Sequence, residues 1–161
     1  MIVSFFIISF ILDGILSNYL SNSLLVPLFG LVSLLSLYIF FKGDNEYYKC
    51  AFIYGFFYDI IYTNTFIFYA CMFLLMAFII KNMSKVFASN FLNLSLGVVV
   101  VVSIFRTITY LCFWFTRGFD FNYHILFKGI YSSLILNIFY ANVLRVIADF
   151  IVFEIKKRRY Y

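Results

Sequence analysis

The chain has 161 residues, of which 65% are apolar and 12% charged, and its mean hydropathy is +1.02. An ordinary soluble domain has roughly 45–50% apolar and about 25% charged residues, and a small fold leaves a large share of its surface exposed. The composition therefore excludes a soluble domain, a disordered chain and a disulfide-stapled scaffold, and it predicts an all-α, polytopic membrane protein. The net charge of +5 comes mainly from basic residues near the expected helix ends, so it indicates membrane topology and not nucleic-acid binding.

Six apolar runs predict a bundle of about six transmembrane helices in a single transmembrane domain, residues 1–161. A spanning helix needs about 20 residues, so six of them leave about 40 residues for tails and connections. The second run opens with Val26-Pro27. This fits the start of a helix, because proline is tolerated in the first helical turn. The third and fourth runs are short and flank a turn-forming Thr63-Asn64-Thr65. In chain order the runs cover residues 2–20, 24–41, 48–62, 66–80, 91–115 and 130–155.

The distribution of Lys and Arg predicts the orientation of the six helices. The two tails and the connections after the second and fourth helices together carry eight basic residues, whereas the remaining connections carry two. Basic residues favour the cytoplasmic side of a membrane. We therefore expect both termini to be cytoplasmic.

Three charged residues fall inside these runs: Asp13 in the first, Asp59 in the third and Arg106 in the fifth. A charge at the centre of a membrane helix costs at least ~2.5 kcal/mol, so each of them needs a partner. We expect an ion-pair or hydrogen-bond cluster that holds the three helices together. Two alternatives remain open: a functional polar site for a ligand or a partner helix, and solvation in a water-filled vestibule.

Small and polar residues recur every four positions on three predicted helices, and residues four apart share a helix face. Such faces let membrane helices approach closely and form hydrogen bonds. They fit packing within the bundle, or a docking face for another protein's helix, with the last helix as the first candidate. Asn137 is expected to hold helices together inside the bundle, and Arg145 to reach the cytoplasmic interface. The stripes are Ser9, Asp13 and Ser17; Ala51, Gly55 and Asp59; and Ser133, Asn137, Ala141, Arg145 and Asp149.

The sequence contains none of the common catalytic motifs. It has no nucleophile elbow, no metal-binding His-Glu helix, no glycine-rich phosphate loop and no Cys-x-x-Cys. We therefore expect a protein that is not an enzyme and that uses no cofactor and no metal. The candidates for an intramembrane polar cluster or a helix-docking site are Asp13, Gly55, Asp59, Arg106, Asn137 and Arg145.

The stretch Tyr54-Gly55-Phe56-Phe57-Tyr58-Asp59, followed by a short turn and another apolar run, resembles the glycine-x3-aspartate helix of the rod shape-determining protein MreD family. Val26-Pro27, Leu136-Asn137 in the last helix and the basic tail are also similar, so the resemblance covers nearly the whole chain. Two positions differ. The family often has a glycine where this chain has Ile67, and a proline where it has Ser132 or Ser133.

The resemblance implies a non-enzymatic, multi-pass component of the bacterial cell-elongation complex in the cytoplasmic membrane. Such proteins work with the bitopic partner MreC, the actin-like MreB filament and the wall synthases to guide lateral peptidoglycan synthesis. Membrane lipids are the other expected partner, and no nucleic acid is expected.

Two other function classes remain open. The substrate-binding subunits of energy-coupling-factor vitamin transporters are also bundles of about six helices, and they dock a partner through small residues on the first helix. The first run of this chain has Asp13 and Ser17 but no alanine-x3-alanine stripe. An intramembrane enzyme would need paired acid–base or metal-binding residues, and Asp13, Asp59 and Arg106 are too few.

Overall fold

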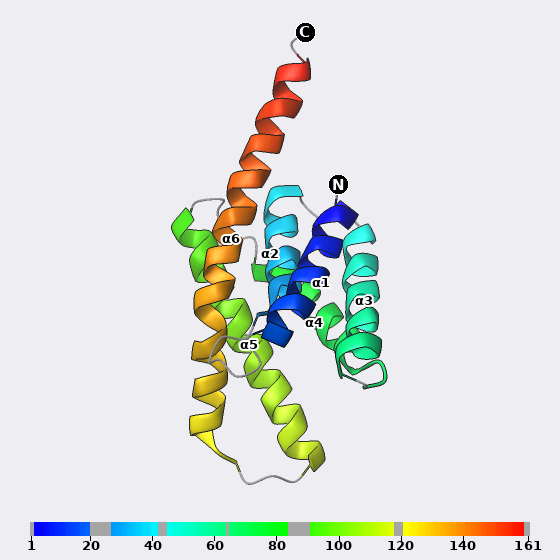
Figure 1. Ribbon diagram of the computed structural model, residues 1–161, viewed down its shortest axis with the longest axis vertical. Helices are drawn as coiled ribbons and strands as arrows, with labels where there is room; N and C mark the ends of the chain where they lie inside the picture. The colour runs from blue at the N-terminus through cyan, green and yellow to red at the C-terminus, as the bar shows by residue number, and fades with distance from the viewer. Residues whose placement is uncertain are drawn as a thin grey trace.

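The computed structural model describes residues 2–19, 27–41, 45–63, 65–83, 91–117 and 121–159. Within these residues the chain is all-helical, as predicted, and contains no strand (Figure 1). The elements are α1 (Ile2–Tyr19), α2 (Phe29–Phe41), α3 (Asn45–Tyr58), the π-helical turn η1 (Asp59–Thr63), α4 (Phe68–Met83), α5 (Phe91–Arg117) and α6 (Tyr123–Arg159).

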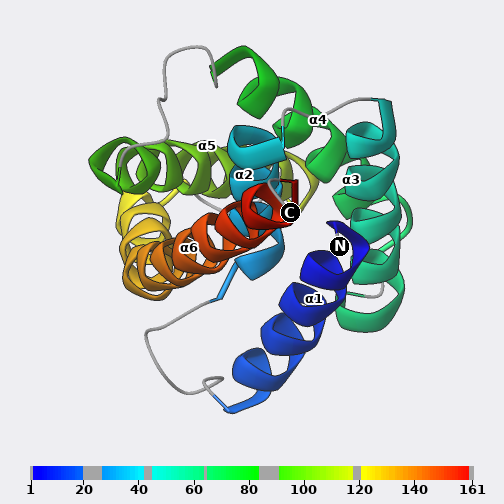
Figure 2. The same cartoon turned by 90° about the horizontal axis from the view of Figure 1, so that it is seen from above.

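Helix α2 is the centre of the bundle. Seen from above it lies between the other five helices, and it contacts each of them (Figure 2). Every residue from Pro27 to Leu37 is buried. A helix that is apolar all round must be buried on all sides, and the sequence Phe-Gly-Leu-Val-Ser-Leu-Leu-Ser-Leu over residues 29–37 has this character. The core is therefore built around α2 and not between two layers.

The starts of α2, α3 and α6 differ from the predicted ones. Pro27 lies before α2 and not in its first turn, because the carbonyl of Leu28 accepts the first helical hydrogen bond, from the N–H of Val32. Helix α3 begins at Asn45, so it includes part of the segment expected to be a loop. Helix α6 begins at Tyr123, which places Lys128 inside the helix. Val26 lies outside the described residues.

A local cap explains the early start of α6. The side-chain Oδ1 of Asn122 accepts the N–H of His124 at 2.9 Å, and the hydroxyl of Tyr110 on α5 both accepts from the N–H and donates to the carbonyl of Asn122. Asparagine is among the best N-cap residues. In the sequence, Asn122 marks this helix start as an N-cap residue. The hydropathy pattern alone does not show where the helix begins.

In the part of the chain that the structure describes, two helical stretches, Leu92–Thr116 and Tyr123–Phe150, are long and apolar enough to cross a membrane. The apolar parts of α1, α2 and α4 are shorter and cover Phe5–Ser17, Phe29–Ile39 and Phe68–Met83. Large apolar side chains are also exposed on the outer faces of the bundle, among them Ile7, Ile53, Phe78 and Phe139.

The turn before α4 contains a backbone conformation that side chains disfavour. Ile67 has φ 63°, in the left-handed region where a β-branched residue is a genuine outlier. Its carbonyl accepts the N–H of Cys71, so Ile67 occupies the N-cap position of α4. This is also the position at which the chain differs from the MreD pattern, which often has glycine there.

We expect Ile67→Gly to raise the free energy of unfolding by about 1 kcal/mol, because an L side chain meets a penalty of about 1–2 kcal/mol in this region and glycine does not. Thermal unfolding in a mild detergent measures the change. The control is Ile135→Gly, at an exposed position within α6, which should lower stability by about 1 kcal/mol. A lower free energy of unfolding for Ile67→Gly than for wild type would contradict the conclusion that the backbone at Ile67 disfavours a side chain.

Candidate functional site

The start of α2 lies inside the bundle and lacks a capping side chain of its own. Its N-cap residue is Leu28, which has no oxygen to offer the free N–H groups of the first turn. Other helices supply the acceptors. Asn137 Oδ1 on α6 accepts from the N–H of Leu28 at 3.0 Å, and the two carboxylate oxygens of Asp13 on α1 accept from Phe29 and Gly30 at 2.8 and 3.0 Å. The N–H of Leu31 bonds to the carbonyl of Leu28, so all four N–H groups have partners.

A tyrosine from a third helix completes the site of Asp13. The hydroxyl of Tyr54 on α3 donates to Asp13 Oδ2 at 2.8 Å. The Tyr54 ring lies against Gly30, where an added Cβ would overlap the ring. Asp13 is 4% exposed, and its charge faces the positive end of the α2 dipole. The carboxylate therefore joins α1, α2 and α3.

Asp59 performs the same task for α4. Its two oxygens accept from the N–H groups of Tyr69 and Ala70 at 3.0 and 2.9 Å. The hydroxyl of Thr65 also donates to Asp59, and Thr63 and Thr65 share a hydrogen bond of 2.7 Å. Asp59 is 1% exposed. The start of α4 thus has its acceptor on the preceding helix, since Ile67 cannot provide one.

Gly55 allows this cap to form. It lies on α3 four residues before Asp59, the first residue of η1, and the backbone of α4 passes directly over it. A Cβ at this position would lie 2.5 Å from the carbonyl oxygen of Tyr69 and 2.6 Å from Ala70 Cα. The glycine-x3-aspartate motif is therefore one device: the glycine admits the start of α4, and the aspartate binds it.

The expected ion pair between Arg106 and an aspartate is not formed. Within the described residues the ion pair present joins Arg145 Nε and Asp149 Oδ2, at 3.6 Å. Arg106 Nε instead donates to Ser133 Oγ on α6 at 2.9 Å, and its Nη2 is buried without a hydrogen-bond partner among the described residues. Both carboxylates are instead bound by backbone N–H groups of the helix starts that they cap.

The polar stripes of α1 and α6 face inward over most of their length. Ser9 on α1 shares hydrogen bonds with Ser33 on α2 and Tyr140 on α6, whereas Ser17 is exposed. On α6, Ser133, Asn137 and Ala141 are fully buried. This part of α6 packs inside the bundle, which favours packing within the bundle over docking of another protein's helix. The stripe reaches the surface only beyond Arg145, where Asp149 is exposed.

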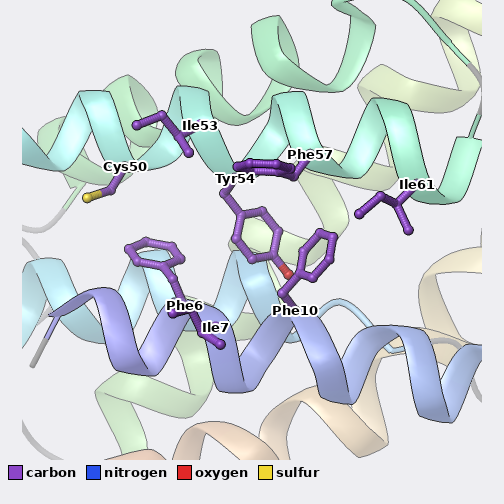
Figure 3. Close-up of a pocket in the computed structure, with 8 residues that line it drawn as sticks. All are labelled: Phe6, Ile7, Phe10, Cys50, Ile53, Tyr54, Phe57 and Ile61. Carbon is purple, nitrogen blue, oxygen red and sulfur yellow. The ribbon is translucent and has the colours of Figure 1, made fainter.

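An apolar groove of about 480 Å³ lies between α1 and α3. Figure 3 shows Phe6 and Phe10 of α1 and Tyr54 of α3 directed into the space between the two helices, and Ile7, Ile53 and Phe57 also line it. Cys50 and Ile61 line its two ends. The hydroxyl of Tyr54 is held by Asp13, so the groove presents hydrocarbon along almost its whole length.

Among the described residues, no group of three or more His, Cys, Asp or Glu side chains is placed to hold a metal ion. Comparison with protein-family models, with curated proteins and with solved structures finds nothing that matches the chain. The interpretation of the site therefore depends on its geometry.

The structure brings Asp13 and Asn137 together at α2 and Gly55 and Asp59 together at α4, and it places Arg106 and Arg145 apart from both caps. Tyr54 is the residue of the site that the sequence patterns did not single out. The sequence did contain a signal for a cap on α2 from another helix. Pro27 stands before an apolar run that has no N-cap side chain, so the acceptors for the first turn must come from elsewhere in the protein.

We expect Gly55→Ala to lower the free energy of unfolding by about 1–3 kcal/mol, because the new Cβ overlaps the α4 backbone. Gly129 on α6 provides the matched control, since a Cβ there meets nothing within 4 Å. Gly129→Ala should be neutral or stabilising by up to about 1 kcal/mol. Thermal unfolding of the two variants tests the pair, and equal effects of the same sign would contradict the close approach at Gly55.

We expect Asp13→Leu to lower the free energy of unfolding by about 3 kcal/mol or more, because each buried group left without an acceptor costs about 1–3 kcal/mol. The affected donors are the N–H groups of Phe29 and Gly30 and the hydroxyl of Tyr54. Asp13→Asn keeps one carbonyl oxygen and should lose less. Asp149→Leu removes an exposed carboxylate and should change stability by less than about 1 kcal/mol. Asn and Leu variants of equal stability would exclude the capping role.

Proposed function

We propose that the protein is a six-span component of the bacterial cell-elongation complex, with both termini cytoplasmic, and that it acts by docking the membrane-spanning helix of a partner. The resemblance to the MreD family implies that the complex is the cell-elongation complex and that the partner is MreC. MreB and the wall synthases are reached through the complex, and the protein performs no chemistry of its own.

The exposed surface supports the membrane part of the proposal. Large apolar side chains face outward on α1, α3, α4, α5 and α6, as expected where lipid tails replace water. The cap of α2 supports it too. A backbone N–H in hydrocarbon has no water to bond and must find a protein acceptor, and Asp13 provides acceptors for the start of α2, which is buried in the bundle.

The observation that carries the docking function is the groove between α1 and α3. Its lining extends over 12 residues of α3 and η1, from Cys50 to Ile61, which corresponds to a length of about 17 Å at ~1.5 Å per residue. An elongated hydrocarbon groove suits the side of a helix better than it suits a compact, polar vitamin. It therefore favours helix docking over the transporter-subunit alternative.

The state of the carboxylates supports a role without catalysis. Asp13 and Asp59 each have both oxygens engaged by backbone N–H groups. A general acid or base must reach a substrate proton directly or through one water. Carboxylates held in this way serve the architecture of the bundle.

The test fills the groove without disturbing the core. Ile53→Trp changes an exposed residue of the groove, and Ile135→Trp changes a comparably exposed residue of α6 outside it. In a depletion strain of a rod-shaped host, we expect Ile53→Trp to reduce co-purification of MreC about tenfold and to give rounder cells, since a lost central contact of about 1.4 kcal/mol or more corresponds to that factor. Ile135→Trp should behave as wild type.

Membrane levels of both variants are matched to wild type before the comparison. Normal cell shape and normal co-purification with Ile53→Trp would contradict docking at the groove. Normal shape with the whole protein depleted would remove the cell-elongation function itself, and a vitamin-uptake defect in the same strain would point to the transporter alternative.

A further inference from the structure

A second cavity, of about 260 Å³, lies between the start of α4 and the facing sides of α5 and α6. Arg106 lines it together with Tyr69, Thr109, Tyr110 and Gly129. It is separate from the groove between α1 and α3, with which it shares no lining residue. The cell-elongation proposal does not use it.

Arg106 is the charged group of this cavity. A guanidinium has five N–H donors. Nε donates to Ser133 Oγ, and Nη2 is buried without a hydrogen-bond partner among the described residues. The hydroxyl of Thr109 is directed to the carbonyl of Phe105 at 2.8 Å, and that of Tyr110 is engaged with Asn122. A cation that is largely buried and has one neutral acceptor is costly. An anion in the cavity would supply an acceptor for the buried Nη2 of Arg106.

The depth of Arg106 indicates which anion can reach it. The rings of Phe68 and Phe113 lie 5.4 Å apart and those of Tyr69 and Phe105 lie 6.3 Å apart, so Arg106 is level with the first turn of α4. Helices α3 and η1 together have 19 residues, about 28 Å at ~1.5 Å per residue. That length nearly crosses a hydrocarbon core of about 30 Å. In the proposed topology the turn before α4 is thus at the external boundary, and Arg106 is close to the lipid head groups.

The mouth of the cavity faces the outside of the bundle. Ile125, which lines it, is exposed, as are Leu111 on α5 and Phe127 on α6. Arginine binds phosphate oxygens through two parallel N–H bonds. A volume of about 260 Å³ holds such a group but not a helix.

We propose that this cavity is a lipid site, in which Arg106 binds the phosphate of an anionic phospholipid of the external leaflet while the acyl chains lie on the exposed apolar side chains of α5 and α6. The inference rests on the membrane-spanning part of the proposed function and is independent of any role in cell elongation. The chemistry recognised is a phosphate ester, which free phosphate shares only in part, since it lacks the acyl chains.

The experiment uses the full chain in nanodiscs of phosphatidylcholine with or without phosphatidylglycerol, and native mass spectrometry counts the lipids that remain bound after release. We expect wild type to retain phosphatidylglycerol. Arg106→Leu should weaken retention about tenfold or more, as expected for loss of a charge-assisted contact. Gly129→Leu keeps the arginine but fills open space beside the cavity, and it should weaken retention to a similar degree.

Arg145→Leu is the control for loss of one positive charge, and it should retain the lipid as wild type does. Thermal unfolding of each variant establishes that it is folded. Equal retention by wild type, Arg106→Leu and Gly129→Leu would overturn the proposal, as would the absence of retained phosphatidylglycerol on wild type. Displacement of the lipid from wild type by inorganic phosphate at equal concentration would also overturn it, because the site would then recognise the free anion.

Discussion

A backbone N–H group at a helix start must have an acceptor, and in an apolar bundle water cannot provide one. Helix α2 begins at fully buried residues and α4 at partly buried ones, and both have an aliphatic residue, Leu28 or Ile67, at the N-cap position. Each start therefore depends on an aspartate from another helix, Asp13 for α2 and Asp59 for α4. Helix α6 begins where Asn122 is exposed, and it carries its own cap. The contrast follows from burial.

The other buried polar side chains, Arg106 and Asn137, are arranged around these two capping carboxylates. Their oxygens accept from backbone N–H groups, and Arg106 bonds to Ser133 and not to either carboxylate. The same arrangement fixes Asn137, which supplies one acceptor to α2 and so cannot face a partner protein. Polar groups that the sequence places at similar depth thus separate into two caps and one arginine in a cavity of its own.

Small residues and aromatic rings make these caps possible. At α4 it is Gly55 that admits the backbone of the capped helix, and at α2 it is Gly30 that admits the ring of Tyr54, whose hydroxyl reaches Asp13. The ring of Tyr54 also forms the floor of the groove between α1 and α3. The surface proposed for a partner helix is therefore supported from beneath by the same residue that completes the internal cap.

The sequence by itself determined the all-α class, the existence of the six helices and the internal importance of Asp13, Gly55 and Asp59, because hydropathy and the four-residue spacing are local properties of the chain. Only the tertiary structure decided what those residues bind. An aspartate in an apolar helix calls equally for a cation or for N–H donors, and the choice depends on which helix start is brought beside it. The positive φ of Ile67 and the position of Tyr54 over Gly30 were likewise fixed by packing between segments distant in sequence, which no local pattern encodes.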